Sequence, residues 1–164
     1  LILIGSSNAV NLTDGLDGLA GSLSAIAFIA FALISFMVGF EDIGIFCLVL
    51  VGSLIGFLVY NTHPAKIFMG DTGSLALGGV MGAVAILTHR ELTLLVVALV
   101  FVIETLSVIL QVIWVKLFHH KLFLMTPLHH HFEKLGWSET DIVKLFCTFG
   151  LILAMLGILF GVWL

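Results

Sequence analysis

Long apolar runs, separated by short polar stretches, dominate this chain. A membrane-spanning helix needs about 20 mostly apolar residues, and the runs predict five complete spans after the end of another at 1–5. The runs are continuous and lack the alternation of barrel strands, so the pattern predicts an all-α, polytopic transmembrane helical bundle. The fourth span is long enough to tilt or bend. The predicted spans are 19–40, 43–60, 75–88, 92–118 and 142–164.

Three polar stretches, 8–21, 61–74 and 119–141, are predicted to lie on one side of the membrane, because each span changes the side. The turns at 41–42 and 89–91 then lie on the other side. Lysines fall on or near the first side, and only Arg90 falls on the second, so the positive-inside rule makes the first side cytoplasmic. The lysines are Lys66, Lys116, Lys121, Lys134 and Lys144.

Composition supports a membrane protein, since the chain is 61% hydrophobic, only 10% charged and has a mean hydropathy of +1.28. A soluble domain carries about 25% charged residues, and 164 residues cannot hide this much apolar surface from water. The lipid bilayer is therefore the expected solvent, and nothing indicates nucleic acid. The chain opens inside an apolar run, so we expect 1–164 to be one transmembrane domain, the carboxy-terminal part of a longer chain.

The first polar stretch holds two carboxylates, Asp14 and Asp17, each followed by glycine. Asn11 precedes Asp14 by three residues, so on a helical turn these side chains share a face. Clustered oxygen ligands suit Mg²⁺, which takes one or two carboxylates together with substrate phosphate. A polar turn with aspartate as a helix cap explains the same residues, and spacing alone does not decide between the two.

The second polar stretch ends in Phe-Met-Gly-Asp-Thr-Gly-Ser at 68–74, directly before a span. Unpaired amides at a helix start, with glycines around them, favour an anion or a metal-bound phosphate. The stretch is not a Walker loop, which requires Gly-Lys-Ser/Thr. Asp71 or Ser74 alternatively caps the next span, and Asn61 and His63 are further polar groups upstream.

The third polar stretch contains consecutive histidines at 129–131, which suit a transition metal, acid–base chemistry or phosphate contact. Consecutive helical residues point in different directions, which argues against a three-histidine zinc site. Glu104 lies inside the fourth predicted span, where a carboxylate costs roughly 2.5–3.5 kcal/mol. It therefore forms a buried hydrogen bond or lines a substrate cavity. Gln111 lies nearer the cytoplasmic end and is better placed to touch a ligand.

These stretches resemble those of the polyprenyl-phosphate N-acetylhexosamine-1-phosphate transferases. The segments 8–20, 68–74 and Pro-Leu-His-His-His-Phe-Glu at 127–133 are similar to the branch that transfers phospho-N-acetylmuramoyl-pentapeptide, and the resemblance covers essentially the whole chain. It implies transfer of that group from UDP-N-acetylmuramoyl-pentapeptide to undecaprenyl phosphate, with Mg²⁺, giving lipid I and UMP. The implied setting is peptidoglycan biosynthesis at the cytoplasmic face of the bacterial inner membrane.

The resemblance also implies roles for individual residues. Asp71 would be the Mg²⁺ ligand, and Asp14 with Asn11 would lie near the metal and the phosphates. The histidines His129, His130 and His131 would contact the sugar nucleotide. The residues implied to border the uridine pocket are Gly15, Leu16, Asp17, Asn61, Phe68 and Gln111, with Phe68 stacking near the base.

Two alternatives stay open, a sister transferase that uses another UDP-amino sugar and an ion-coupled transporter. The transporter needs carboxylates spread across the bilayer, whereas Asp14 and Asp71 lie at one membrane edge and only Glu104 lies deeper. The family also has an adjacent aspartate pair and phosphate-binding basic residues in its amino-terminal half, which this chain lacks. We therefore expect the 164 residues to be inactive alone. Family members are often homodimers, although no pattern here marks an interface.

Overall fold

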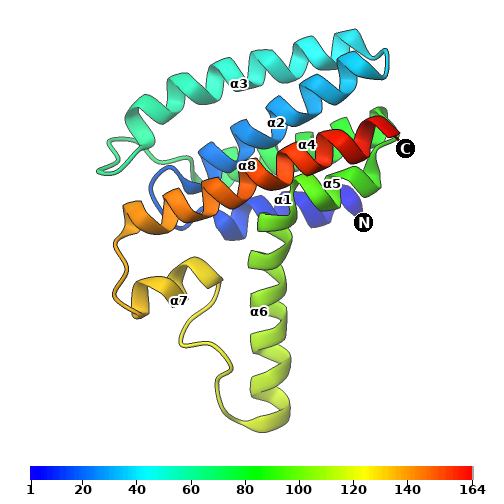
Figure 1. The fold of residues 1–164 in the computed structure, drawn as a ribbon. Coiled ribbons are helices and arrows are strands. Elements are labelled where there is room, and N and C mark those ends of the chain that lie inside the picture. Colours follow the sequence, from blue (N-terminus) through cyan, green and yellow to red (C-terminus); the bar gives the residue numbers. More distant parts are fainter. Residues whose placement is uncertain (164) are drawn as a thin grey trace.

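The structure is a computed structural model that describes residues 1–163, and this range contains helices and no strand. The predicted all-α class is therefore confirmed. The helices are α1 (Ile2–Thr13), α2 (Leu19–Met37), α3 (Glu41–Asn61), α4 (Gly70–Leu87), α5 (Glu91–Val97), α6 (Leu99–Phe118), α7 (Leu128–Lys134) and α8 (Glu139–Trp163), as Figure 1 shows.

Five of the described helices, α2, α3, α4, α6 and α8, are long and apolar enough to cross a membrane, judged by length and composition. They confirm the predicted number of complete spans, and α1 takes the place of the partial span at the start. Leu164, the last residue of the fifth predicted span, lies outside the described residues.

The first two polar stretches are shorter than predicted, because helices extend into both. Helix α1 continues to Thr13, although a loop was predicted from Asn8. The polar side chains bond within the helix: Asn8 Nδ2 donates to the Ile4 carbonyl and Thr13 Oγ1 to the Ala9 carbonyl, each at 2.8 Å. Only 14–18 remains as a turn. Helix α4 likewise begins early, so that 71–74 forms its first turns rather than a loop.

The fourth predicted span, 92–118, is broken at Ala98 into α5 and α6. Ala98 has φ −96° and ψ 18°, outside helical values, and neither proline nor glycine lies nearby in the sequence. Helix α5 packs against α8, whereas α6 packs against α1. Figure 1 shows α6 pointing away from the other long helices, with the chain returning through α7 to α8. Tertiary packing therefore sets the break.

Helix α2 is the centre of the bundle, since 72% of its apolar window is buried, against 22–33% in the other four spans. It packs between α3 and α8, while α1 packs against α4. A Cβ at Gly78 or Gly82 would collide with Ser6, so these small residues let α1 and α4 approach closely. Ser7 Oγ adds a 2.8 Å hydrogen bond to the Leu75 carbonyl.

The three predicted polar stretches meet at one end of the bundle, as the alternation of spans predicts. Asn11 of the first bonds to Asp71 of the second, and Asp17 of the first bonds to Glu139 of the third. At the opposite end, a ring contact joins the turn before α3 to the turn before α5. Two polar ends therefore enclose an apolar middle, and which end faces the cytoplasm stays a prediction.

Candidate active site

Two carboxylates, Asp14 and Asp71, lie close together where α1 ends and α4 begins, and we call them the carboxylate pair. Asp14 directly follows α1, and Asp71 is in the first turn of α4. Asn11, one turn earlier on α1, donates from Nδ2 to Asp71 Oδ1 at 3.0 Å and to Ser74 Oγ at 2.9 Å. The polar residues of two stretches, sixty positions apart, therefore form one oxygen-rich group.

Burial raises the pKa of the Asp14 carboxyl above its ordinary value of 3.8, and the charge of Asp71 adds to the rise. Both causes disfavour two ionised carboxylates side by side. A divalent cation reverses the effect, because a positive charge favours the ionised form of both groups. Oxygen donors at a helix start, where unpaired N–H groups attract phosphate, fit Mg²⁺ bound together with a phosphate group.

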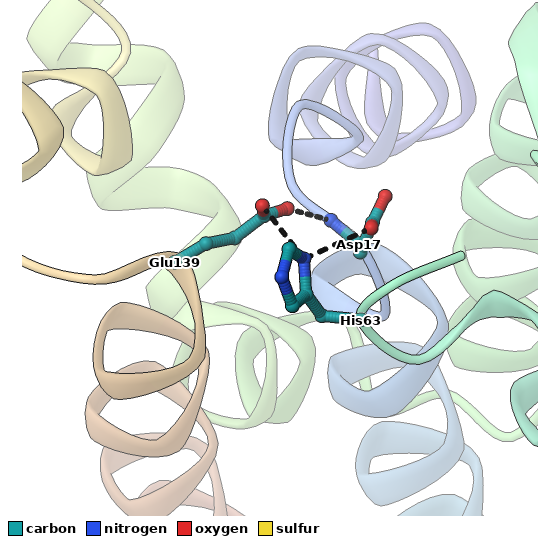
Figure 2. Close-up of side chains that lie close together, drawn as sticks. All are labelled: Asp17, His63 and Glu139. Atoms are coloured by element: carbon teal, nitrogen blue, oxygen red, sulfur yellow. Dashed lines mark hydrogen bonds and ion pairs between the residues drawn. The ribbon is translucent and has the colours of Figure 1, made fainter.

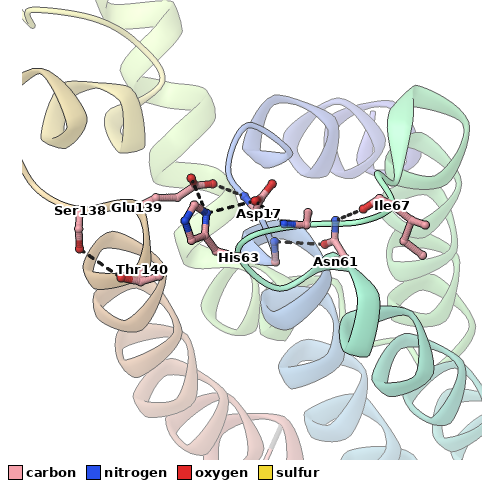
Figure 3. Close-up of polar contacts among 9 residues, drawn as sticks. Asp17, Asn61, His63, Ile67, Ser138, Glu139 and Thr140 are labelled. Atoms are coloured by element: carbon pink, nitrogen blue, oxygen red, sulfur yellow. Dashed lines mark hydrogen bonds and ion pairs between the residues drawn. The ribbon is translucent and has the colours of Figure 1, made fainter.

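The turn that carries Asp14 is fastened to the segment before α4 by the buried side chain of Asn61. Asn61 Oδ1 accepts from the Gly18 N–H at 3.1 Å, and Asn61 Nδ2 donates to the Ile67 carbonyl at 2.9 Å (Figure 3). Gly18 has φ +79°, a left-handed conformation that favours glycine. Asn61 thus holds the 14–18 turn in place through backbone contacts.

A second titratable group, His63 with Asp17 and Glu139, lies at the same end, and we call it the His63 cluster. His63 Nδ1 lies 3.2 Å from Asp17 Oδ2 and 3.1 Å from Glu139 Oε2 (Figure 2). The Ala65 N–H donates to Asp17 Oδ2 at 2.9 Å, and the Asp17 N–H donates to Glu139 Oε1 at 2.5 Å. One ligand atom from each side chain lies within 4.8 Å of the others, a spacing that fits a metal ion.

Sequence reasoning missed the His63 cluster. His63 was visible only as a further polar group upstream of Asp71, and Glu139 carried no signal of its own. Asp17 and Glu139 are 122 positions apart, so no local spacing links them. The cluster joins all three polar stretches, and only packing of the helices brings them together.

The three consecutive histidines bond to three different partners. The His129 N–H donates to Glu104 Oε1 at 3.2 Å, and His129 Nδ1 lies 3.2 Å from Glu104 Oε2, with both side chains fully buried. His130 Nδ1 pairs with Glu133, and His131 Nδ1 accepts a backbone N–H of the preceding loop at 3.2 Å. Of the two possibilities weighed for Glu104, the buried hydrogen bond is the one observed.

The remaining predicted pocket residues differ in how they are placed. Gly15 is exposed in the turn beside His129, whereas the side chain of Leu16 is buried in the core. Phe68 is 77% exposed and borders a groove of about 370 Å³ between α3 and α4. Gln111 Oε1 accepts backbone N–H groups of the loop after α6, so its amide supports that loop.

An apolar groove of about 340 Å³ lies between α1, α5 and α6. Ile2 and Val10 line it from α1, Leu94 from α5 and Phe101 from α6. Val10 lies one helical turn before Asp14, so this part of the lining is near the carboxylate pair. Its lining suits a hydrocarbon chain rather than a polar ligand.

Comparisons with known proteins give matches over the whole chain. Residues 1–89 match the model of a family described as glycosyl transferase family 4. The chain is 57% identical over 164 residues to a phospho-N-acetylmuramoyl-pentapeptide-transferase of Shouchella clausii (strain KSM-K16), covering 100% of this chain and 50% of that protein. It is 58% identical over 163 residues to the protein of that name from Geobacillus thermodenitrificans (strain NG80-2), covering 99% and 50%. The chain thus spans about half the length of the curated relatives it matches.

Proposed function

We propose that this chain, which belongs to glycosyl transferase family 4, carries the metal- and nucleotide-binding end of a membrane enzyme. The enzyme would transfer phospho-N-acetylmuramoyl-pentapeptide from UDP-N-acetylmuramoyl-pentapeptide to undecaprenyl phosphate, giving lipid I and UMP. The names of relatives at 57–58% identity support this reaction. Because the chain covers half of their length, the activity is proposed for the complete protein, and the 164 residues alone are expected to be inactive.

The observation that carries the proposal is the carboxylate pair, joined through Asn11 where α1 meets α4. Phosphoryl transfer depends on positioning and charge neutralisation more than on covalent chemistry of the protein. Asp71 would hold Mg²⁺, with Asp14 and Asn11 beside it. When bound, the metal would neutralise negative charge on the diphosphate and on the departing UMP. The amide of Asn11 keeps Asp71 oriented, and the start of α4 offers N–H groups to a phosphate.

The turn at 14–18 is the proposed wall of the uridine pocket. Its fastenings through Asn61 and through the backbone N–H of Asp17 support a rigid wall. Leu16 would contribute its backbone, because its side chain is buried. The remaining proposed pocket and sugar-nucleotide contacts are Gly15, Phe68, Gln111, His129, His130 and His131.

The apolar groove between α1, α5 and α6 is the proposed seat of the polyprenyl chain of the acceptor. Its lining reaches Val10, one helical turn before Asp14, so a lipid phosphate at that end would lie near the carboxylate pair. The excess of lysines near this end supports a cytoplasmic orientation in the bacterial inner membrane.

The structure gives little support to the transporter alternative. An ion path needs carboxylates at several depths of the bilayer. Among the carboxylates weighed for such a path, Asp71 lies in the first turn of α4, and only Glu104 lies further inside a spanning helix, where it is buried against His129. Asp14 and Asp71 lie together at one end of the bundle, which favours a reaction at the membrane surface.

The test follows UMP release by the complete gene product in detergent, with undecaprenyl phosphate as acceptor. We expect release from UDP-N-acetylmuramoyl-pentapeptide that requires Mg²⁺. Release only from UDP-N-acetylglucosamine would assign the protein to the sister reaction. No release from either donor, by protein that is folded by its thermal transition, would overturn the proposal.

A further inference from the structure

Glu104 is a fully buried carboxylate whose two oxygens are both engaged by one residue. Oε1 accepts the His129 backbone N–H at 3.2 Å, and Oε2 lies 3.2 Å from His129 Nδ1. Both side chains have no exposed surface. A carboxylate in an apolar interior needs hydrogen-bond partners. Both partners of Glu104 are atoms of His129, in the first turn of α7.

The pairing decides where the proton of the His129 ring lies. An ionised carboxylate only accepts hydrogen bonds, so the nitrogen that faces Glu104 Oε2 must carry the proton. This places N–H at Nδ1, and in the neutral ring it leaves Nε2 as an acceptor. A carboxylate behind an imidazole commonly fixes both tautomer and ring orientation in this way.

The other ring nitrogen faces the turn that carries Asp14. His129 Nε2 is buried and has no hydrogen-bond partner among the described residues. A Cβ at Gly15 would collide with it, so the ring lies directly against Gly15, the residue after Asp14. A buried ring nitrogen without a partner is rare, so its position against the turn beside Asp14 points to a role at that turn.

The geometry points to Glu104 as a positioning residue that acts through His129 on the Asp14–Gly15 turn, and so sets Asp14 relative to Asp71. This inference rests on the proposed function, in which the carboxylate pair holds the metal-bound diphosphate. The contacts run from Glu104 in α6 to His129 in α7, then to Gly15. Glu104 itself touches no substrate.

The first variant is Glu104→Gln in the complete gene product, and Ser107→Ala is the matched control. Glutamine can accept the His129 N–H through Oε1, but its NH₂ group then faces Nδ1. The ring stays in place while its proton moves to Nε2, where it faces Gly15 as a donor. Ser107 is also buried in α6, and its hydroxyl donates to the backbone carbonyl of Glu104, so its loss changes the helix beside Glu104 without removing a contact of the Glu104 side chain with His129.

The readouts are kcat and KM for UMP release, and the rise in thermal midpoint that Mg²⁺ produces. We expect Glu104→Gln to fold, to lower kcat by about ten- to a hundredfold and to need more Mg²⁺ for half of the midpoint rise. We expect kcat to fall by a larger factor than KM for the UDP donor rises, because Glu104 acts on the turn that carries Asp14 and reaches the uridine-facing residues of that turn only indirectly. Ser107→Ala keeps the parent values.

A double variant tests whether the effect passes through His129. If it does, Glu104→Gln lowers kcat no further in a His129→Asn background, because coupled residues are not additive. His129→Asn also serves if Glu104→Gln does not fold. The amide NH₂ of the asparagine can still donate to Glu104, but its side chain is too short to contact Gly15. We therefore expect the same weakening of the Mg²⁺ effect.

Failure of this inference differs from failure of the proposed function. A parent protein that releases no UMP overturns the proposed function, and the positioning role falls with it. An active parent whose Glu104→Gln and His129→Asn variants keep its kcat and Mg²⁺ dependence overturns the positioning role alone. Additive losses in the double variant also overturn it.

Discussion

The carboxylate pair and the His63 cluster lie at the same end of the bundle but differ in the partners that their carboxylates have. In the cluster, Asp17 and Glu139 each accept one backbone N–H and share His63 Nδ1. In the pair, Asp71 is bonded to Asn11, and burial with the Asp71 charge raises the pKa of Asp14. Ligand spacing alone favours the cluster as a metal site, whereas electrostatics favours the pair. Carboxylates that already accept hydrogen bonds, as those of the His63 cluster do, are stabilised less by a bound cation.

The largest difference is expected in activity, between Asp71→Asn and Glu139→Gln. Asp71→Asn removes the proposed metal ligand, so kcat for UMP release should fall on the order of 10³-fold, because several kcal/mol of charge stabilisation are lost. Glu139→Gln keeps an oxygen for the Asp17 N–H and should cost less than about tenfold. Similar losses in both variants would remove the functional distinction between the two groups.

Metal-induced stabilisation gives the next largest difference. A ligand at 100 times its Kd adds about 2.7 kcal/mol to the free energy of unfolding, so Mg²⁺ should raise the thermal midpoint of the complete protein. We expect the rise in the parent and in His63→Ala, and its loss in Asp71→Asn. If His63→Ala instead abolishes the rise, the cluster is the cation site.

The smallest effect concerns stability without metal, measured for Asp14→Asn in the presence of a chelator. Between 3.8 and the raised pKa of Asp14, the folded protein binds more protons than the unfolded protein. The free energy of unfolding therefore falls as the pH rises through that window. At pH 7 the folded protein bears the full cost of ionising Asp14. Asparagine removes the cost, so the midpoint at pH 7 should rise by at most about 2–4 °C.

The pH dependence supplies the control for this variant. Protonation of Asp14 in the parent removes the same charge, so the advantage of Asp14→Asn should shrink as the pH falls through the window. An advantage that does not change with pH would assign the effect to packing instead of charge. A lower midpoint at pH 7 would contradict the raised pKa.

The spans were predictable because each depends on local composition. A run of about 20 apolar residues satisfies its backbone within one helix and its side chains in lipid. The ends were less predictable: Asn8 and Thr13 lie in α1 because their side chains bond to carbonyls of the same helix. The break at Ala98 was not predictable, because no proline or glycine lies near it in the sequence.

The site was predictable where residue type limits the chemistry. Asn11, Asp14 and Asp71 were visible as oxygen donors, and the alternation of spans placed them at one end. The pairing of Glu104 with His129 was not predictable. The two residues are 25 positions apart on different helices, and they meet only because the chain turns back after α6.

The sequence by itself determined that the chain is a helical membrane bundle whose polar stretches gather at one end. Apolar runs and the alternation of sides are properties of the chain read in order. Only the tertiary structure decided that Asp17 and Glu139 pair with His63, whereas Asp14 and Asp71 lie beside each other. Hydrogen bonding and burial depend on partners distant along the chain, such as Glu139 for Asp17, and packing alone chooses those partners.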